Sequence, residues 1–296
     1  MQPSNVCARD RASRQFGRML KETQGAIRLR LLTGLFLAGV AAVLIWVPQL
    51  HLVFTLALAL MVGLGLYEYY GMAQKCGLDV DARGGIAVGV ALLLSAYLGK
   101  PAAFAAMFTL GFGLLAVAHM ARNKHSLAGL AASIFGVIYV AWMGSHLVAL
   151  HGIGDLGPGL VTLVIGAVAL SDTGAYFVGS AIGKHKMAPA LSPKKSWEGA
   201  LGGIAFACIL MGLVAWGRPH LPAWMLFPDW SLGYYLFLGA LLSVAGQIGD
   251  FMESMLKRNA GIKDSGAFFP GHGGVLDRCD GFLFAGPVMY YTFTLL

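Results

Sequence analysis

The chain has 296 residues, of which 57% are hydrophobic and only 12% are charged, against about 25% charged residues in an average soluble domain. The mean hydropathy is +0.71, so most of the chain is suited to lipid, and its length leaves no room for a second globular domain. The four cysteines have no CxxC spacing, which argues against a zinc site or a disulfide framework. The net charge of +7 could indicate nucleic-acid binding, but its distribution, described below, excludes that function.

Residues 1–27 are polar and rich in arginine. Asp10 and Glu22 interrupt the basic pattern, and no small-residue cleavage site follows the first apolar run. We interpret this segment as a cytoplasmic, basic N-terminal extension that leads into an uncleaved first span. A surface-lying amphipathic helix and an organelle transit peptide are the alternatives. Residues 28–296 are then expected to form a single transmembrane domain.

Nine apolar segments predict an all-α fold, a polytopic integral membrane helical bundle, because a span needs about 20 predominantly apolar residues. The expected spans are 30–49, 52–72, 84–99, 101–120, 126–150, 157–182, 199–217, 231–250 and 281–296. The third is short and the fourth follows it closely. No internal repeat is evident, which weighs against the pseudosymmetry common in secondary transporters.

Lysine and arginine are distributed unevenly between the two sides of this bundle. With the N-terminus in the cytoplasm, nineteen of the 21 fall on the cytoplasmic side, and only Lys100 and Arg218 on the other. The positive-inside rule therefore predicts nine spans with N-in/C-out topology. The positive charge is then a consequence of topology, and no nucleic-acid partner is expected.

Asp172 lies within the sixth expected span, after sixteen residues without a charge. An acid inside a span that faces a polar cavity indicates function. A buried hydrogen bond to a neighbouring helix is the structural alternative.

The next loop, residues 183–199, carries four lysines: Lys184, Lys186, Lys194 and Lys195. The positive-inside rule places lysines here without any further role, and Ser196 can serve simply as the N-cap of the seventh span. The functional interpretation is a basic mouth that attracts an anionic nucleotide or lipid head group. Charge alone does not decide between these interpretations.

Four polar residues at the end of the eighth expected span share one helical face, because Gln247, Asp250, Ser254 and Lys257 are spaced i, i+3, i+7 and i+10. A carboxylate at the membrane boundary is costly unless it is paired or bound to a metal, so function is the first interpretation for Asp250. The alternative is an interfacial acid paired with Lys257 or Arg258.

The segment 270–280 contains His272-Gly273-Gly274 followed by Asp277-Arg278-Cys279-Asp280. Glycines permit positive φ and close backbone approach, as in loops that hold phosphates. Asp277 and Asp280 are three residues apart and share a face if a helix begins here. Carboxylates without a Cys/His set suit Mg²⁺ or Mn²⁺ better than zinc. The alternative, an ordinary turn with Asp277 as an N-cap, explains one aspartate of the charged region rather than three.

Other polar residues indicate less. Glu68 stands among Tyr67, Tyr69 and Tyr70, and we interpret it as an interfacial residue of an aromatic belt. The histidines near span ends lack the paired spacing of a metal site; they are His119, His125, His146 and His151.

The region 254–280 is similar to the signature of phosphatidate cytidylyltransferases, also called CDP-diacylglycerol synthases. The matching residues are Ser254-x2-Lys257-Arg258-x4-Lys263-Asp264-x-Gly266-x2-Phe269-Pro270-x-His272-Gly273-Gly274-Val275-x-Asp277-Arg278-x-Asp280. Ser171–Tyr176 and Ser192–Gly199 resemble the upstream motifs of the family, and the resemblance covers about residues 28–296. Cys279 and Ser196 depart slightly from the usual pattern, and neither departure affects a charged position.

The resemblance implies that CTP and phosphatidate react to give CDP-diacylglycerol and pyrophosphate, with Mg²⁺ required and a second cation left open. It also implies an all-helical membrane protein, a homodimer, in the bacterial inner (cytoplasmic) membrane, with its site near the cytoplasmic face. Carried over by motif, Asp250 and Asp277 are the expected metal carboxylates, with Asp280 close by. The expected catalytic residues are Asp277, Asp250 and Lys257.

The expected substrate-binding residues come from the same motifs. They are Ser254, Arg258, Lys263, Asp264, His272, Gly273, Gly274, Arg278, Asp172, Lys194, Lys195 and Ser196. Because the phosphate of phosphatidate is already ionised at neutral pH, His272 is expected to contact phosphate or shape the loop rather than act as a base. A membrane transporter or proton-coupled carrier that uses Asp172 and Asp250 is the alternative function.

Overall fold

The computed structural model describes residues 38–295, apart from 123–125, 267 and 269–272. The chain divides into two compact units, residues 1–44 and 45–296. In the first unit residues 38–44 are helical. The predicted extension 1–27 and the start of the first predicted span lie outside the described residues. Every element discussed below belongs to the second unit.

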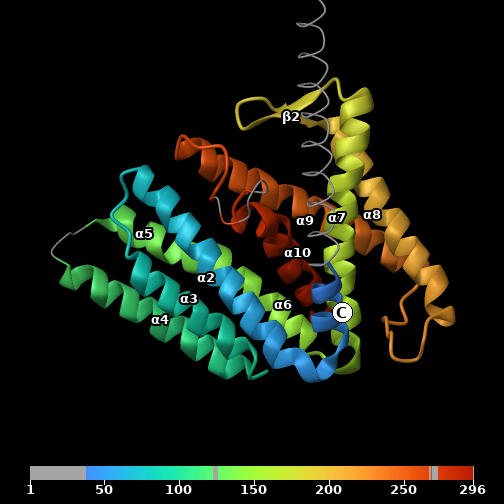
Figure 1. Cartoon of the computed structure of the whole chain (residues 1–296), viewed down its shortest axis with the longest axis horizontal. Coiled ribbons are helices and arrows are strands. Elements are labelled where there is room, and N and C mark those ends of the chain that lie inside the picture. Colours follow the sequence, from blue (N-terminus) through green and yellow to red (C-terminus); the bar gives the residue numbers. More distant parts are fainter. Residues whose placement is uncertain (1–37, 123–125, 267, 269–272, 296) are drawn as a thin grey trace, which may run out of the picture. The chain divides into compact units, whose positions relative to one another are not determined.

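The second unit is built almost entirely of helices (Figure 1). The elements are η1 (Pro48–Leu50), α2 (His51–Lys75), α3 (Ala82–Ala96), α4 (Pro101–Ala121), α5 (Leu127–Gly136), the π-helical η2 (Val137–Trp142), α6 (Met143–His151), η3 (Gly154–Leu156), α7 (Gly157–Ile182), β1 (Lys186–Ala188), β2 (Ser192–Ser196), α8 (Trp197–Gly217), η4 (Arg218–His220), α9 (Leu232–Asn259) and α10 (Leu276–Leu295). Helices occupy every predicted span position from the second onward. The largest difference is in α9, which continues to Asn259 instead of ending at residue 250.

Six helical stretches of the described chain are long and apolar enough to cross a membrane, and the protein is an all-α polytopic membrane protein. These stretches are His51–Lys75, Pro101–Ala121, Leu127–His151, Gly154–Ile182, Trp197–His220 and Leu232–Asn259. Helix α3 is apolar but shorter, with 15 residues. Helix α10 has a polar beginning, with Asp277 and Arg278 in its first turn and Asp280 directly after it.

Short polar side chains determine where several helices begin. Asp81 accepts a hydrogen bond from the Gly84 amide and caps α3. Ser126, Ser196 and Ser231 cap α5, α8 and α9 in the same way. Each cap satisfies one of the amides that a first helical turn leaves without an intrahelical partner.

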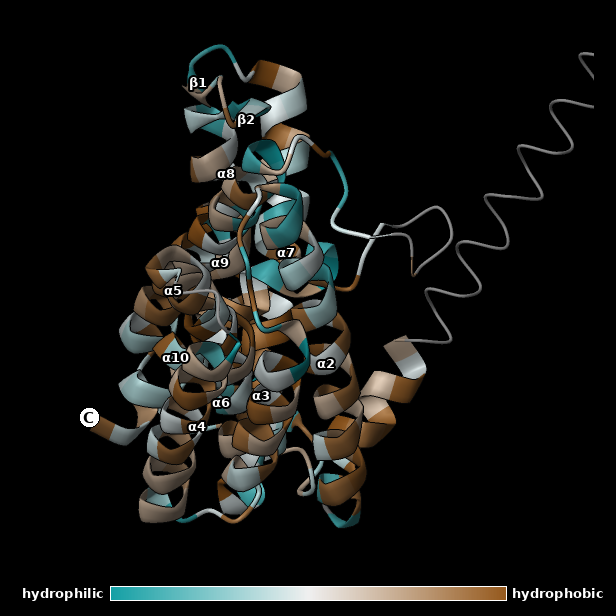
Figure 2. Ribbon diagram, turned by 90° about the vertical axis from the view of Figure 1, so that its left-hand side faces the viewer, coloured by the Kyte–Doolittle hydropathy of each residue, from teal (hydrophilic) through white to brown (hydrophobic). Residues whose placement is uncertain are grey.

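The predicted loop 183–199 is an antiparallel hairpin of β1 and β2, in which Lys186 pairs with Ser196 and Ala188 with Ser192. The hairpin is the one departure from an all-helical fold among the described residues. It connects α7 to α8, which pack together more extensively than any other pair of helices. Figure 2 shows hydrophobic residues along the helices and hydrophilic residues gathered around this hairpin.

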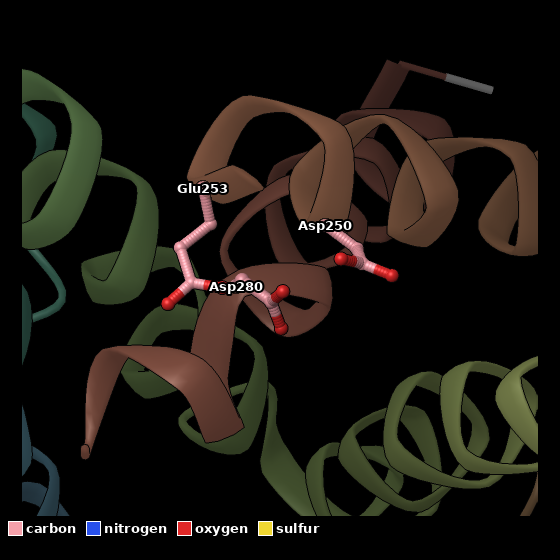
Figure 3. A group of neighbouring side chains, drawn as sticks. All are labelled: Asp250, Glu253 and Asp280. Atoms are coloured by element: carbon pink, nitrogen blue, oxygen red, sulfur yellow. The ribbon is translucent and has the colours of Figure 1, made fainter. Parts of the chain in front are cut away.

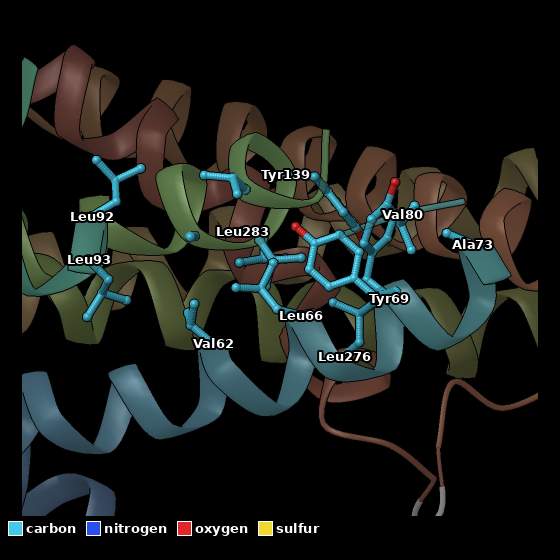
Figure 4. Close-up of a cluster of buried hydrophobic side chains, with 14 of the residues drawn as sticks. Val62, Leu66, Tyr69, Ala73, Val80, Leu92, Leu93, Tyr139, Leu276 and Leu283 are labelled. Carbon is cyan, nitrogen blue, oxygen red and sulfur yellow. The ribbon is translucent and has the colours of Figure 1, made fainter. Parts of the chain in front are cut away.

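A large apolar cluster lies where α2, α3, η2 and the start of α10 meet. Leu66, Leu92, Leu93 and Leu276 are fully buried in it, and Tyr69 and Tyr139 contribute rings (Figure 4). This cluster holds α2 against the N-terminal turn of α10. It therefore fixes the helix that carries Asp277 and Asp280.

Candidate active site

Helices α9 and α10 touch closely at Gly249. A Cβ atom at position 249 would lie 2.2 Å from the carbonyl oxygen of Asp280, so only glycine permits this contact. Since Asp250 follows Gly249 directly, the contact brings the two aspartates together. The crossing of the two helices thus explains why Asp250 and Asp280 lie close together although they are 30 positions apart in the sequence.

Three carboxylates meet at this crossing. Asp250 and Glu253 extend from α9 toward α10, which carries Asp280 (Figure 3). One oxygen from each lies within 4.8 Å of the others. The Glu253 residue is 1% exposed, and its Oε1 accepts no hydrogen bond from the part of the chain that the structure describes. A buried oxygen without a partner is costly, and this oxygen is available to a ligand such as a cation.

Lys257 connects this cluster to Asp277. Its Nζ donates to Glu253 Oε2 at 2.7 Å and to Asp277 Oδ1 at 2.6 Å. The other oxygen of Asp277, Oδ2, accepts from the amides of Ser265 and Gly274, each at 2.9 Å. Both oxygens of Asp277 are therefore used by the protein, and Asp277 stands outside the three-carboxylate group.

Lys195, from the hairpin, pairs with Asp250, another member of the carboxylate cluster. Its Nζ lies 2.6 Å from Asp250 Oδ2 and 3.9 Å from the ring centre of Phe251. The ion pair and the cation–π contact together fix the ammonium group against α9. This lysine attaches the hairpin to the carboxylate cluster.

A cavity of 590 Å³ adjoins the cluster, between α7, the hairpin, α8 and α9. Its charged and polar lining consists of Asp172, Tyr176, Ser180, Lys186, Lys194, Lys195, Ser196, Gln247 and Asp250. Asp250 is common to the cavity and the carboxylate cluster. A molecule in the cavity can therefore lie against both lysines and carboxylates.

The charges of the site are unbalanced in a way that suits a cation. Asp277 and the three clustered carboxylates face two ammonium groups in the ion pairs described, Lys195 and Lys257, which leaves two negative charges if all are ionised. Hard carboxylate oxygens without nearby thiolate or imidazole ligands match the preference of Mg²⁺. The residues present thus fit a divalent cation.

The remaining predicted residues are distributed around the site. Ser254 Oγ lies 3.5 Å from Asp250 Oδ1, at the limit of a hydrogen bond. The Arg258 side chain donates to the carbonyls of Leu191 and Ile262, so it joins the end of α9 to the hairpin. Lys263, Asp264 and Arg278 are exposed, and His272 lies outside the described residues.

For two of the predicted residues, Ser196 and Gly273, the structure bears out a feature that the sequence suggested. Ser196 is buried and caps α8, and it also borders the cavity. Gly273 has φ of +84°, which confirms the expected left-handed backbone in the His-Gly-Gly turn. Asp172 is exposed on the cavity wall.

Glu253 and Glu68 are site residues that the sequence reasoning missed. Glu253 is at i+3 from Asp250 and i−4 from Lys257, so the helical period alone could have placed it beside both. Glu68 was expected at the membrane interface. The structure buries it instead, and its carboxylate accepts from the amides of Val275 and Leu276.

A second polar cavity, of 540 Å³, lies near the beginning of α2 and the end of α10. It is lined in part by His51, Lys100, His146 and Tyr291. The imidazoles there are bonded within the protein: His51 Nδ1 lies 2.7 Å from Nδ1 of His151, and His146 Nε2 lies 3.2 Å from Tyr291 Oη. No three-residue metal group occurs there among the described residues.

Comparison with known proteins agrees with the geometry. A model of the cytidylyltransferase family matches residues 28–296. A protein of Synechocystis sp. named phosphatidate cytidylyltransferase is 32% identical over 270 residues, which cover 82% of this chain and 89% of that protein. Proteins of the same name from Staphylococcus saprophyticus and Staphylococcus haemolyticus are 35% and 36% identical, over 62% of this chain and 66% of each relative. The chain therefore belongs to the cytidylyltransferase family.

Proposed function

We propose that this protein makes CDP-diacylglycerol and pyrophosphate from CTP and phosphatidate, the reaction that the names of its relatives indicate. The observation that supports this most directly is Asp250, which belongs both to a buried carboxylate cluster and to a lysine-lined cavity. Joining two phosphate compounds requires positive charge beside both. The cavity supplies it through lysines, and the cluster supplies ligands for a cation.

In this reaction an oxygen of the phosphatidate phosphate attacks the α-phosphorus of CTP. The new bond joins that oxygen to the α-phosphorus, and the bond from the α-phosphorus to the bridging oxygen breaks in line, so that pyrophosphate leaves with the electron pair. The attacking oxygen is already ionised near neutral pH, so no side chain has to remove a proton. The protein acts by positioning and by electrostatic stabilisation.

The lysines of the hairpin are placed to hold the nucleotide phosphates. Lys186, Lys194 and Lys195 line the cavity from one side, and Lys195 is already directed at Asp250. Lys257 has a different role, because among the described residues its ammonium group pairs with two carboxylates, Glu253 and Asp277. It orients Glu253 and Asp277 rather than binding phosphate directly.

Asp250, Glu253 and Asp280 are the residues that would hold Mg²⁺. When bound there, the ion supplies positive charge that offsets repulsion between the phosphates and orients their oxygens. Asp277, which the motif comparison named as a ligand, is proposed to support the cluster through Lys257. The ligand assignments stay predictions until the metal is located.

The test is direct. Purified protein receives labelled CTP and Mg²⁺ with and without phosphatidate, and lipid-soluble CDP product is followed. We expect product only with phosphatidate, loss of product on adding a chelator, and recovery with excess Mg²⁺. A matched sample of Asp250→Asn should be inactive. The proposal would be contradicted if the wild-type protein consumed CTP equally with and without phosphatidate. It would also be contradicted if no sample consumed labelled CTP.

We further propose nine spans, an N-in/C-out topology, a cytoplasmic site in the bacterial inner membrane and a homodimer. The lysine and arginine asymmetry supports the topology, and the bacterial relatives support the location. In a variant without the four native cysteines, His185→Cys should react with a membrane-impermeant thiol reagent only from the cytoplasmic side. Asp229→Cys should react only from the other side, and the reverse pattern would invert the topology. Native mass spectrometry reports the oligomeric state.

A further inference from the structure

Glu68 lies far from the carboxylate cluster in sequence but is connected to it in the structure. The residue is 8% exposed in α2, about two turns before the helix ends at Lys75. A buried carboxylate in an apolar helix is costly unless its oxygens are satisfied. Its bonding partners therefore indicate why it is there.

Glu68 has three hydrogen bonds with described residues, and all three go to the segment that carries the family signature. Oε1 accepts from the Val275 amide at 2.9 Å, and Oε2 accepts from the Leu276 amide at 2.8 Å and from Ser265 Oγ at 2.9 Å. The two amides belong to the beginning of α10, which starts at Leu276. Glu68 thus caps α10 from another helix and places negative charge at its N-terminus, where the helix dipole favours it.

Ser265 extends this contact to Asp277. Its Oγ lies 2.9 Å from Glu68 Oε2 and 3.0 Å from Asp277 Oδ2. The hydroxyl has a single proton and can donate to one carboxylate at a time. The hydroxyl of Ser265 therefore lies between the carboxylates of Glu68 and Asp277, within hydrogen-bond distance of both.

The contacts form a continuous chain to the cluster. Glu68 contacts Ser265, Ser265 contacts Asp277, Asp277 contacts Lys257, and Lys257 contacts Glu253. Ser265, Asp277 and Lys257, which lie between the two ends of this chain, each have at least two of the described hydrogen bonds. A change at Glu68 is consequently transmitted to the carboxylates without any contact between Glu68 and substrate.

The close packing at Gly274 shows that this arrangement is tightly specified. A Cβ at position 274 would lie 2.1 Å from Ser265 Oγ and 2.5 Å from Glu68 Oε2. Any side chain there would force the serine or the glutamate away. The glycine in the signature therefore accommodates Glu68.

We propose that Glu68 is a positioning residue of the active site, which fixes the start of α10 and, through Ser265 and Asp277, the orientation of Lys257 and Glu253. It supports turnover without touching the substrates. The inference rests on the proposed function for its kinetic test and on the described contacts for its structural test.

The main variant is Glu68→Gln, which keeps the size of the side chain. Its NH₂ group must face either the Val275 amide or the Leu276 amide, so one amide loses its acceptor. We expect kcat for CDP-lipid formation to fall about 10–100-fold, as for residues that orient ligands, while KM for CTP changes little. Glu68→Asp keeps the charge and should retain more activity than the glutamine variant.

Asp81→Asn is the matched control, because Asp81 is also a carboxylate that caps a helix, α3, at a distance from the site. It should lower thermal stability but leave kcat within about twofold, since loss of a cap acts on stability. If both variants lose stability and kcat equally, Glu68 has a merely structural role and the inference is wrong. An unchanged kcat in Glu68→Gln would also overturn it.

Two measurements separate this inference from the proposed function. Combining Glu68→Gln with Ser265→Ala should reduce kcat by less than the product of the single effects, because both act through Asp277; a multiplicative loss contradicts the chain of contacts. Hydrogen exchange of residues 273–280 should be faster in Glu68→Gln than in Asp81→Asn. An inactive wild-type protein with this exchange difference would refute the proposed function and leave the structural role of Glu68 supported.

Discussion

Two cavities lined by described residues have similar volumes, 590 Å³ at the hairpin and 540 Å³ near the beginning of α2 and the end of α10. They differ in how their polar groups are satisfied. The hairpin cavity adjoins the carboxylate cluster, where carboxylates outnumber the ammonium groups that pair with them and Glu253 Oε1 has no partner among the described residues. At the far cavity His51 and His146 are bonded to other side chains.

The comparison teaches that unbalanced charge, rather than size or polarity, distinguishes a site from a stabilised cavity. Polar groups that satisfy one another contribute to stability and leave nothing for a ligand to complete. Carboxylates crowded together store repulsion that a cation relieves. Variants at the two cavities should therefore affect different properties.

The largest effect is expected from Asp280→Asn. Removing one carboxylate of the cluster should lower kcat on the order of 10³-fold, because a metal-assisted step loses several kcal/mol of stabilisation. The melting temperature should stay equal or rise, since one of three crowded negative charges is gone. CDP-lipid formation and thermal unfolding in detergent measure the two properties. Retained turnover would show that Asp280 is not needed in the cluster.

Lys257→Met should affect both activity and stability. It keeps an apolar stem but leaves Glu253 and Asp277 buried without their cation, which should lower the free energy of unfolding by roughly 3–5 kcal/mol. We expect kcat to fall about 100-fold because the carboxylates lose their orientation. Chemical denaturation and steady-state kinetics test this. Lys75→Met, at the exposed end of α2, is the control and should match the wild type.

Ser196→Ala should have a small effect that separates capping from substrate binding. Losing the bond from the Gly199 amide costs about 1 kcal/mol of stability, and kcat should change by less than about threefold if capping is its main task. Ser126→Ala removes an equivalent cap from α5 and should cost as much stability. A large rise in KM for CTP in Ser196→Ala alone would restore the substrate-binding interpretation.

The smallest effect on activity is expected from His146→Phe in the far cavity. The phenyl ring removes the hydrogen bonds of the imidazole to the Tyr291 hydroxyl and to the Trp142 carbonyl, which together should cost about 1–3 kcal/mol of unfolding free energy. Turnover should equal that of the wild type at temperatures where both are folded. A lower kcat with unchanged stability would show that the far cavity takes part in the reaction and would break the comparison.

Local sequence patterns were sufficient where the chemistry is local. Apolar length predicted the positions of the helices, and the helical period placed Asp250 and Lys257 on one side of α9. The same period places Glu253 beside Asp250 and Lys257, although Glu253 is not one of the residues of the family motif. The hairpin was missed because Ser192-Pro193-Lys194-Lys195 has no alternation of apolar and polar residues.

Contacts between distant segments could not be predicted in this way. The partners of Glu68 are about 200 positions away, as for Ser265 with a separation of 197, and no periodicity links a tyrosine-rich helix to the start of α10. Asp277 illustrates the same limit. Its motif predicts a metal ligand, which stays a prediction, and no local pattern showed that Lys257, Ser265 and Gly274 would surround it.

The length of α9 has a consequence for where the reaction takes place. From Leu232 to Asp250 the helix rises about 27 Å at about 1.5 Å per residue, close to the hydrocarbon thickness of about 30 Å. If α9 begins near one edge of the hydrocarbon layer, its length places Asp250 at the other edge. Lipid phosphates lie close to that edge. The remaining turns, to Asn259, extend into the head-group layer. A phosphate-bearing lipid can then meet the carboxylates by lateral diffusion, with its acyl chains still in the bilayer.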